Sequence, residues 1–339
     1  MEARPSSDLD HFSRTLSGLS ARPLWERASH TARAQAVPAI WRYADMRPQL
    51  LRAIDLITAE EAERRVLMLE NPGLPGTGLI TNSLFCGLQA ISPGETAPAH
   101  RHSPNALRLI IESDGAYTNV AGERITIHRG DLVLTPGWAW HDHGHLGSKP
   151  AFWLDALDLA FGHLFGKIFR ESDEAGTRSA RSEAEGTAAA RYGTNLLPVE
   201  HHSQLNHSPL LAYPYERTRE VLERLARHGP VDPVHGVRMR YANPADGGFI
   251  FRTIAAFILW LPKGFEGRTY RSTESTVFCA IEGSGTIRTG DESFAFAQDD
   301  VFVVPPWTAY SIESARECVL FSYSDRAAQI ALGFWREDA

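Results

Sequence analysis

The residues with the most chemical content are three histidines in two short stretches of the chain. His100 and His102 are separated by one residue, and His141 follows a later turn at Gly130-Asp131. Because side chains alternate along a strand, His100 and His102 point to the same face if their stretch is extended. A third imidazole from a later strand completes a set of ligands on one side of a metal ion. The opposite positions stay open, which predicts a catalytic metal centre.

The ligand types narrow the choice of metal. Imidazole nitrogens suit Fe(II), Zn, Cu and Ni, so histidines alone do not choose among them. Three neutral ligands leave the metal its full positive charge, and a chelating substrate with a carboxylate and an ortho phenolate would neutralise it. Fe(II) can pass electron density from such a substrate to dioxygen, whereas Zn is redox-inactive. We therefore expect Fe(II), one ion per chain.

Composition and charge exclude several classes of protein. The 339 residues, 43% hydrophobic and 22% charged, are typical of a globular protein of about two domains. A net charge of -7 disfavours nucleic acid and membrane surfaces as partners. The three cysteines are far apart and fit neither a disulfide framework nor a zinc knuckle. With no signal-peptide core and no apolar span, we expect a cytoplasmic protein.

The elements that must position these histidines are mostly strands. Residues 1 to about 70 are expected to be helical, with a capping box from Thr58 to Glu61. From Thr77 to about Leu159, short apolar runs alternate with Gly, Pro and Asp, which indicates a β-sandwich or barrel. Residues 171–192 are small, charged and unpatterned, and they predict a mobile loop or linker. Residues 215–227 predict a helix, and strands return from about residue 247.

The two β-rich parts repeat one pattern. The spacing from Gly94 to His100 and His102 recurs 170 residues later, and the spacing of Pro136, Trp138 and His141 recurs 169 residues later. Such a register predicts an internal duplication. In the second copy the three histidines are replaced, in order, by Tyr270, Ser272 and Tyr310. The second copy is therefore expected to be structural, without a metal.

These motifs resemble the cupin double motif of a metal-binding jelly roll. The usual cupin also has a glutamate three or four residues after the second histidine, but this chain has Ala106 and Leu107 there. The chain is similar to the gentisate 1,2-dioxygenase family, which includes salicylate and 1-hydroxy-2-naphthoate dioxygenases. The segments that carry this resemblance, and that span nearly the whole chain, are 64–73, 140–143, 153–158 and 213–218.

The resemblance implies a mainly β bicupin with flanking helices, two jelly-roll β-barrels from the duplication. The expected divisions are a helical segment (1–75), the metal-binding cupin (76–162), a linker with a mobile loop and a helix (163–243), and a cupin that has lost its metal site (244–339). The resemblance also implies a homotetramer.

Two side chains are expected near the metal because of their position on the strands. Arg108 lies six residues after His102 with the same parity, so on a continuous strand it faces inward and can bind a carboxylate. His143 shares the face of His141. It is expected to contact substrate or to handle a proton, the alternative being a partner for a metal ligand. Arg64 or Arg65 can reach in from the preceding segment, and the sequence does not choose between them.

The resemblance adds further pocket residues. Gln89 is similar to a glutamine that hydrogen-bonds the substrate, and Trp153 and Asp155 match the pocket wall. Gentisate-specific relatives are expected to have tyrosine and alanine where this chain has Phe85 and Gly87. The loss of a hydroxyl and the added space favour salicylates that lack a 5-hydroxyl, including 5-substituted ones.

The predicted activity is cleavage of the aromatic ring of a small hydroxy acid between its carboxyl- and hydroxyl-bearing carbons, with both oxygen atoms of dioxygen incorporated. Salicylate, 5-substituted salicylates and gentisate are the candidate substrates. A strict gentisate 1,2-dioxygenase is the main alternative. A non-catalytic ligand-binding cupin and a metal-dependent isomerase or hydrolase are alternatives of other classes.

Overall fold

The computed structural model describes residues 6–26, 35–173, 182–199, 206–290 and 292–338. The chain divides into two units, Met1–Ala34 and Gln35–Ala339. The described part of the first unit holds helix α1 (Ser6–Gly18) and a short 3-10 helix, η1 (Leu24–Glu26). Their aromatic rings Phe12 and Trp25 stack with centroids 6.5 Å apart. The strands and the candidate site belong to the second unit.

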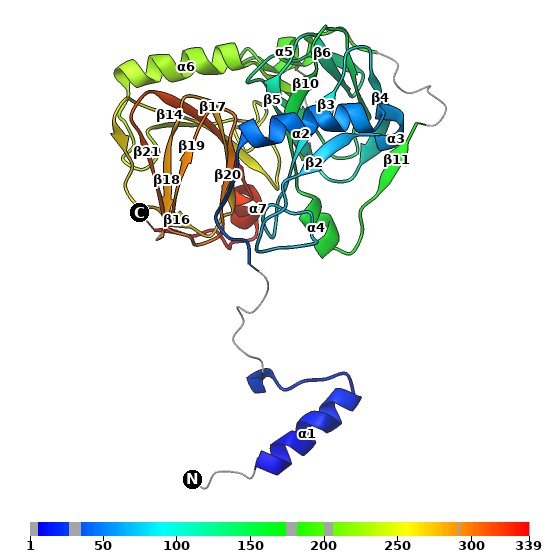
Figure 1. Ribbon diagram of the computed structural model, residues 1–339, viewed down its shortest axis with the longest axis vertical. Coiled ribbons are helices and arrows are strands. Elements are labelled where there is room, and N and C mark those ends of the chain that lie inside the picture. The colour runs from blue at the N-terminus through cyan, green and yellow to red at the C-terminus, as the bar shows by residue number, and fades with distance from the viewer. Residues whose placement is uncertain (1–5, 27–34, 174–181, 200–205, 291, 339) are drawn as a thin grey trace. The chain divides into compact units, whose positions relative to one another are not determined.

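The first half of the second unit is a sandwich of two sheets (Figure 1). The larger sheet has the order β12 (Ala212–Tyr213), β8 (Leu132–Thr135), β5 (Ala106–Glu112), β10 (Ala151–Leu157), β3 (Phe85–Ile91), β2 (Arg65–Met68). The smaller sheet has the order β11 (Arg170–Ser172), β4 (Thr96–His102), β9 (His141–His145), β6 (Ala116–Val120), β7 (Glu123–Thr126). Apolar side chains from both sheets fill the space between them, among them Ile110, Val120 and Trp153.

The second half repeats this arrangement. Its larger sheet has the order β1 (Ala39–Trp41), β20 (Val301–Val304), β17 (Thr276–Glu282), β22 (Cys318–Ser324), β14 (Ala255–Leu261), β13 (Val237–Arg240). Facing it are β15 (Phe265–Glu266), β21 (Tyr310–Ser314), β18 (Gly285–Thr289), β19 (Glu292–Phe296) and the pair β16 (Arg271–Ser272), β23 (Glu337–Asp338). The strand orders of the two halves match, so the fold is a bicupin whose halves are jelly-roll-like sandwiches and not closed barrels.

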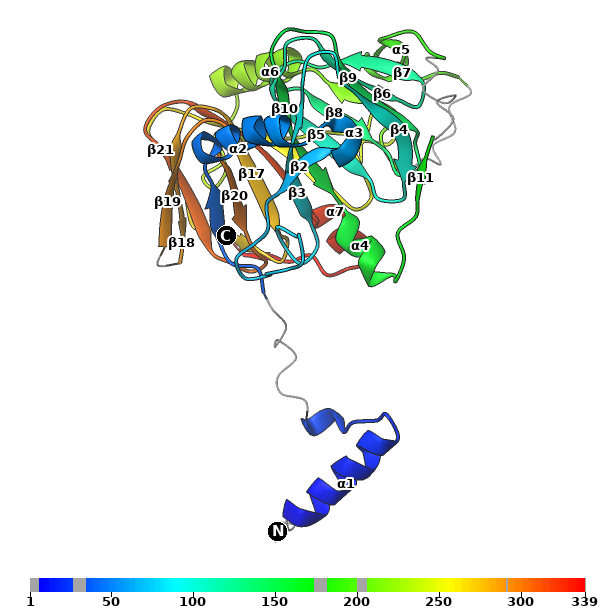
Figure 2. The same ribbon diagram turned by 45° about the vertical axis from the view of Figure 1, so that its right-hand side comes forward.

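The two halves share a core. The largest buried cluster joins apolar side chains from both six-stranded sheets, including Leu88, Leu109, Val277 and Phe321. Both views show the two groups of strands side by side (Figures 1 and 2). The alternate residues of each large sheet are therefore buried as well. This explains why β5, apart from Arg108, and β17 are largely apolar on both of their faces.

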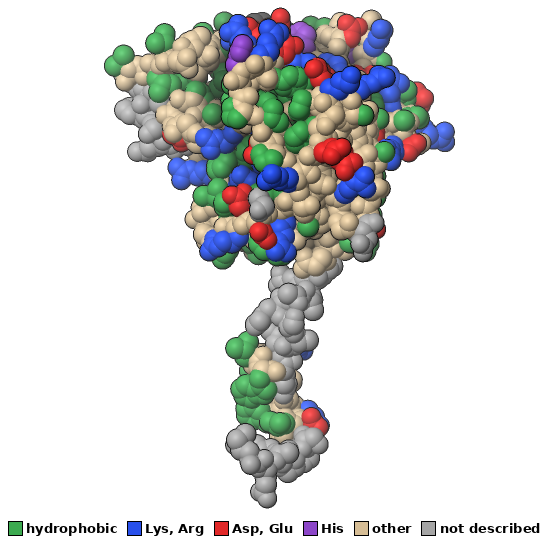
Figure 3. Space-filling model, turned by 90° about the vertical axis from the view of Figure 1, so that its left-hand side faces the viewer, with side chains coloured by type: hydrophobic (Ala, Val, Ile, Leu, Met, Phe, Trp, Pro, Cys, Tyr) green, Lys and Arg blue, Asp and Glu red, His purple; other side chains and the backbone are tan. Residues whose placement is uncertain are grey.

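Helices flank the sheets. They are α2 (Tyr43–Leu56), α3 (Ala59–Ala62), α4 (Leu159–Leu164), α5 (Thr187–Tyr192), α6 (Tyr215–His228) and α7 (Arg326–Ala331). No described helix is long and apolar enough to cross a membrane. Acidic and basic side chains are interspersed over the face of the molecule shown in Figure 3.

Several local expectations meet the structure directly. The capping box is present, because the Thr58 hydroxyl accepts from the Glu61 amide at 3.1 Å and the Glu61 carboxylate accepts from the Thr58 amide at 3.0 Å. The helix predicted over 215–227 is α6. The N-terminal segment that was expected to be helical contains α1, α2 and α3, and it also contains two short strands. Strand β1 completes an edge of the second cupin's sheet beside β20, and β2 completes an edge of the first beside β3.

The stretch expected to be a loop contains ordered elements. Strand β11 pairs with β4, and α5 begins at Thr187, where the Glu123 carboxylate accepts from the amides of Gly186 and Ala188. Residues 174–181 lie outside the described part of the chain, so its expected mobility there stays a prediction.

Candidate metal centre

Two neighbouring strands bring the three predicted ligands together. His100 and His102 lie on β4, and His141 begins β9, directly opposite His100 in the antiparallel register. One nitrogen from each imidazole lies within 4.8 Å of the others. The ring centroids of His100 and His141 are 4.1 Å apart, and those of His102 and His141 are 4.9 Å apart. The arrangement has the size and donor types of a three-histidine metal site.

Backbone carbonyls fix the orientation of two of these rings. The Nδ1 atoms of His102 and His141 lie 2.8 and 2.9 Å from the carbonyl oxygens of Pro104 and Ala139. A carbonyl only accepts, so each Nδ1 carries the proton and each Nε2 keeps a free lone pair. The Nε2 atom of His141 is buried and has no hydrogen-bond partner among the residues that the structure describes. A bound metal would satisfy this orphaned atom, so the residues fit the implied ion.

Burial keeps the imidazoles neutral. It lowers the pKa of His100 to about 2, with Arg64 adding to the effect, and it lowers the pKa of His102 to about 4. Burial also places the pKa of His141 well below its usual value. A metal ion therefore meets neutral imidazoles at neutral pH and does not compete with a second proton on each ring.

An arginine contacts the third ligand. The Arg64 guanidinium Nη2 lies 2.6 Å from Nδ1 of His100 and 2.9 Å from the carbonyl of Pro98. A guanidinium only donates, so this contact needs Nδ1 of His100 unprotonated, with the ring proton on Nε2. To bind a metal through Nδ1, His100 must lose the contact with Arg64. To bind through Nε2, it must move its ring proton to Nδ1, which also requires Arg64 to move away. Arg64 is thus a charged side chain at the edge of the metal centre.

A second arginine lies on the facing sheet. The Nε atom of Arg108, on β5, is 3.0 Å from the Asp155 carboxylate on β10, and its Nη1 contacts the hydroxyl of Thr135. The Trp153 indole donates to the other Asp155 oxygen at 3.2 Å. Burial raises the pKa of Asp155, and the neighbouring Arg108 charge limits the rise. A buried ion pair of this kind holds a guanidinium in one orientation, ready to bind an anion.

His143 lies between the metal ligands and this ion pair. It is fully buried, and its ring centroid is 6.0 Å from that of His141 and 5.4 Å from the Trp153 ring. Its Nε2 atom has no hydrogen-bond partner within the described part of the chain. Burial lowers the pKa of His143 well below its usual value, so the ring is neutral. A neutral imidazole with an orphaned nitrogen can accept or donate one hydrogen bond to a substrate.

The remaining predicted pocket residues share one face of the sheet. Phe85, Gly87 and Gln89 alternate along β3, and Gly87 and Gln89 lie opposite Asp155 and Trp153. A Cβ atom at Gly87 would meet the Val66 side chain at 2.5 Å and the Phe85 ring at 3.2 Å. Glycine is therefore required by the packing of this face as it stands.

The structure separates the two adjacent arginines. Arg65 begins β2, is buried, and pairs with Glu95 through two contacts of 2.5 and 2.6 Å. Only Arg64 of the two contacts a metal-site residue. Thr135 is a site residue that the sequence reasoning missed. Its signal was a hydroxyl at the end of an otherwise apolar strand, directly before the Pro136 of the motif.

Two further side chains are structural. Arg101 points away from the ligand face, pairs with Glu171, and stacks over the rings of Trp138 and Trp140. His145 is the last residue of β9. Its Nε2 lies 2.5 Å from the Lys149 carbonyl, which gives it a role in the following turn.

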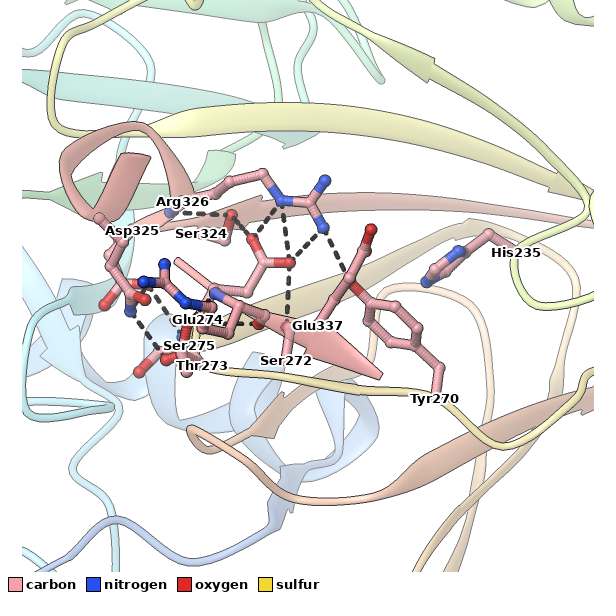
Figure 4. A network of polar contacts seen from close by, with 12 residues as sticks. His235, Tyr270, Ser272, Thr273, Glu274, Ser275, Ser324, Asp325, Arg326 and Glu337 are labelled. Atoms are coloured by element: carbon pink, nitrogen blue, oxygen red, sulfur yellow. Dashed lines mark hydrogen bonds and ion pairs between the residues drawn. The ribbon is translucent and has the colours of Figure 1, made fainter. Parts of the chain in front are cut away.

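The equivalent place in the second cupin is occupied by a salt bridge (Figure 4). Tyr270 pairs with Tyr310 across the strands, as His100 pairs with His141 in the first cupin. The Arg326 guanidinium contacts both oxygens of the buried Glu274 carboxylate at 2.5 to 3.0 Å and donates to the Tyr270 hydroxyl at 3.1 Å. A fixed cation is thus built into this site by a side chain.

The interior of the second cupin is also filled. The strand registers place Phe278 at the position of Arg108, Phe257 at that of Gly87, and Ser322 at that of Asp155. The Phe278 ring stacks on Phe302 with centroids 5.0 Å apart. Aromatic side chains therefore occupy the space that the first cupin keeps polar.

Comparisons with known proteins agree with this geometry. A cupin domain model matches residues 87–157. The chain is 48% identical over 319 residues to a gentisate 1,2-dioxygenase of Aquipseudomonas alcaligenes, covering 93% of this chain and 92% of that protein. It is 32% identical to a 5-aminosalicylate 1,2-dioxygenase of Comamonas sp., covering 98% and 91% of the two chains.

A solved structure extends the likeness to three dimensions. It is a salicylate 1,2-dioxygenase from Pseudoaminobacter salicylatoxidans in adducts with gentisate, with a TM-score of 0.91, 31% identity, and coverage of 100% of this chain and 95% of that one. Fold and site together define a metal-binding bicupin of the 1,2-dioxygenase class. The chain belongs to the gentisate 1,2-dioxygenase family.

Proposed function

We propose that the chain is an Fe(II)-dependent dioxygenase that cleaves 2-hydroxybenzoates, gentisate among them, between the carboxyl- and hydroxyl-bearing carbons. The observation that carries this proposal is the juxtaposition of three neutral imidazoles with the Arg108–Asp155 pair on the facing sheet. The histidines supply no negative charge, so a dianionic chelating acid completes the charge balance of the site. Membership of the 1,2-dioxygenase family supports the same chemistry.

The roles of the chain's own residues follow from their positions. His100, His102 and His141 would hold the iron, which supplies a path for electrons from the ring to dioxygen. Arg108 binds the substrate carboxylate, with Asp155 and Thr135 fixing its orientation. Once released from His100, Arg64 adds a second positive charge at the same edge.

The other polar side chains act on the substrate's hydroxyl and ring. The orphaned Nε2 of His143 accepts the phenolic proton or donates to the phenolate. Gln89 and Trp153 lie opposite each other on neighbouring strands and line the ring's position. Each of these roles is a proposal that mutation tests.

The choice of substrate rests on β3. Phe85 offers no hydroxyl to a 5-substituent, which favours salicylate and 5-substituted salicylates. Gly87 lies opposite Asp155, and the Val66 and Phe85 side chains fill the place that a larger residue would take. Strict specificity for gentisate is the second candidate, and the 48% identity to a gentisate 1,2-dioxygenase favours it. The 5-hydroxyl of gentisate donates electrons and eases oxidation of the ring.

An oxygen-electrode panel decides between them. The iron-loaded enzyme is given gentisate, salicylate, 5-substituted salicylates and 1-hydroxy-2-naphthoate, with metal content measured in parallel. Oxygen uptake with salicylate or its 5-substituted forms supports the broader proposal, and uptake with gentisate alone establishes the strict alternative. Zinc or manganese without oxygen uptake would contradict both and would favour an isomerase or hydrolase.

Location and assembly complete the proposal. The three cysteines are free and buried, which fits a reducing cytoplasm. A homo-oligomer, with four copies as the family resemblance implies, is tested by light scattering of the purified enzyme.

A further inference from the structure

The second cupin contains a cavity beside its salt-bridged network. Its volume is about 490 Å³, and it is lined by His235, Arg238, Tyr270 and Glu337 together with the end of α6 at Gly229. This volume is within the range of small-molecule sites. Figure 4 shows His235, Tyr270 and Glu337 at the edge of the Arg326–Glu274 network.

The cavity lies where the first cupin has the approach to its metal. Strand β13 stands beside β14 as β2 stands beside β3, with Arg238 on β13 at the place of Val66. Just before β2, Arg64 contacts His100. Just before β13, the His235 ring lies 4.9 Å from that of Tyr270, the residue that replaces His100.

Arg238 differs from other arginines that have little solvent exposure. Arg65, Arg108 and Arg326 each pair with a carboxylate. The Arg238 guanidinium stacks on the Phe257 ring at 4.0 Å, and among the described residues it has neither an ion pair nor a hydrogen bond. Its Nε atom is buried without a partner. An unpaired guanidinium facing a cavity is the donor that a carboxylate binds best.

The carboxylates of the two acidic residues at the cavity accept hydrogen bonds from the chain. Glu337 accepts from the Tyr270 hydroxyl at 2.8 Å. Asp232 accepts from the amides of Val234 and His235 at 2.9 and 2.7 Å, and its carboxylate lies 3.6 Å from Nδ1 of His235. Burial and the nearby Arg238 and Arg326 charges keep the pKa of His235 well below its usual value, so this ring is neutral. Arg238 is therefore the charged side chain of the cavity that has no hydrogen-bonding partner among the described residues.

We propose that this cavity is a second, metal-free binding site for a small hydroxylated carboxylic acid, with the carboxylate on Arg238 and the hydroxyl donating to Glu337 or Asp232. Hydroxybenzoates are the first candidates, a choice that rests on the proposed function. The site is not a second catalytic centre, because an arginine–glutamate pair holds the place of the metal. It binds the acid without transforming it.

The test is the number of binding events per chain. Salicylate is titrated calorimetrically into the iron-loaded enzyme without oxygen, where we expect two saturable events. Arg238→Met should leave one event, and Arg238→Lys should weaken the second about tenfold. The matched control is Arg240→Met, an exposed arginine on the same strand, which should keep both events.

The outcomes separate this proposal from the catalytic one. A single event that Arg238→Met leaves unchanged, or two events in a folded Arg238→Met variant, would overturn it. Benzoate, which lacks the hydroxyl, should bind the second site more weakly, and equal competition by inorganic phosphate would contradict a hydroxy-acid site. Oxygen uptake by Arg238→Met should match the unmodified enzyme. Absence of oxygen uptake in both would reject the proposed function and leave the count of binding events as an independent result.

Discussion

At the scale of single residues, the metal centre depends on tautomers that the backbone sets. Carbonyls at Pro104 and Ala139 hold two imidazoles with Nδ1 protonated, so their lone pairs face one point. Nearby, Arg64 and Arg108 place two positive charges beside neutral histidines. This combination favours an anionic chelating ligand over a neutral one.

Removing one imidazole should empty the metal site. We expect His102→Ala to lose bound iron and to lower oxygen uptake more than about 100-fold, because altering even a partner of a ligand costs 10- to 100-fold. His100→Ala and His141→Ala should behave alike. Iron content by mass spectrometry is the measurement, and Tyr270→Ala in the second cupin is the control that keeps its iron. Full activity in any of the three histidine variants would refute the ligand set.

Gly87 places no side chain opposite Asp155, and Val66 packs against it. In Gly87→Ala the new Cβ would overlap Val66, which should cost about 1–3 kcal/mol of stability. We also expect kcat/KM for 5-substituted salicylates to fall more than kcat/KM for gentisate. Adding Val66→Ala should relieve the contact and recover the stability. An unchanged ratio between the two substrates would show that Gly87 does not shape specificity.

At the scale of elements, hydrogen bonds between the two cupins stabilise both halves. The phenol of Tyr323, on β22 of the second cupin, donates to the carbonyl of Phe85 at 2.9 Å and so holds the start of β3. Arg129 similarly joins the first cupin to Asp299 and to the Ile281 carbonyl of the second. The second cupin therefore helps to fix the position of β3, the strand that carries Phe85, Gly87 and Gln89.

Removing the Tyr323 hydroxyl tests this backing. Tyr323→Phe leaves a buried carbonyl without a donor, which should lower the free energy of unfolding by about 1–3 kcal/mol. The midpoint and slope of urea unfolding measure this change. Iron content should stay the same, because the variant touches no ligand strand. A change in iron content with no loss of stability would contradict the assigned role.

At the scale of the whole molecule, buried histidines couple stability to pH. Among the described residues, burial lowers the pKa of six of them: His100, His102, His141, His143, His207 and His235. In the unfolded chain they take up protons near their ordinary pKa of about 6.5, whereas the folded chain does not. Stability is therefore present above pH 6.5 and is lost as the pH falls toward the folded values.

We expect the metal-free protein to unfold at a lower temperature at pH 5 than at pH 7. Each histidine contributes up to about 1.4 kcal/mol per pH unit. Asp325 acts in the opposite sense, since burial raises its pKa to about 6, and burial also raises the pKa of Asp131, Asp142, Asp155, Asp158 and Asp299. The ordinary pKa of aspartate, about 3.9, lies below this pH range, so we expect the histidines to dominate between pH 7 and pH 5. Replacing His235 with phenylalanine, away from the metal centre, should reduce the slope measured by calorimetry. A midpoint that rises on acidification would refute this account.

The sequence by itself indicated the three histidines that the structure brings together, and it indicated the duplication. Both depend on spacing along the chain, because the two-residue period of a strand assigns faces locally and a repeated register reports a repeated fold. The repeated register also showed that Tyr270, Ser272 and Tyr310 replace the three histidines in the second copy. The bicupin architecture followed from these patterns and from the family resemblance.

The tertiary structure decided what depends on distant contacts. Glu63 has a positive φ of 52°, which breaks the strand alternation just before Arg64, so periodicity could not show which of Arg64 and Arg65 turns inward. The pairing of β1 with β20 and the contacts of Thr135 and Tyr323 join residues far apart in sequence. The lack of a polar partner for Arg238 among the described residues is likewise a property of the folded chain. Local periodicity says nothing about such pairs, because only packing of the two sheets brings them together.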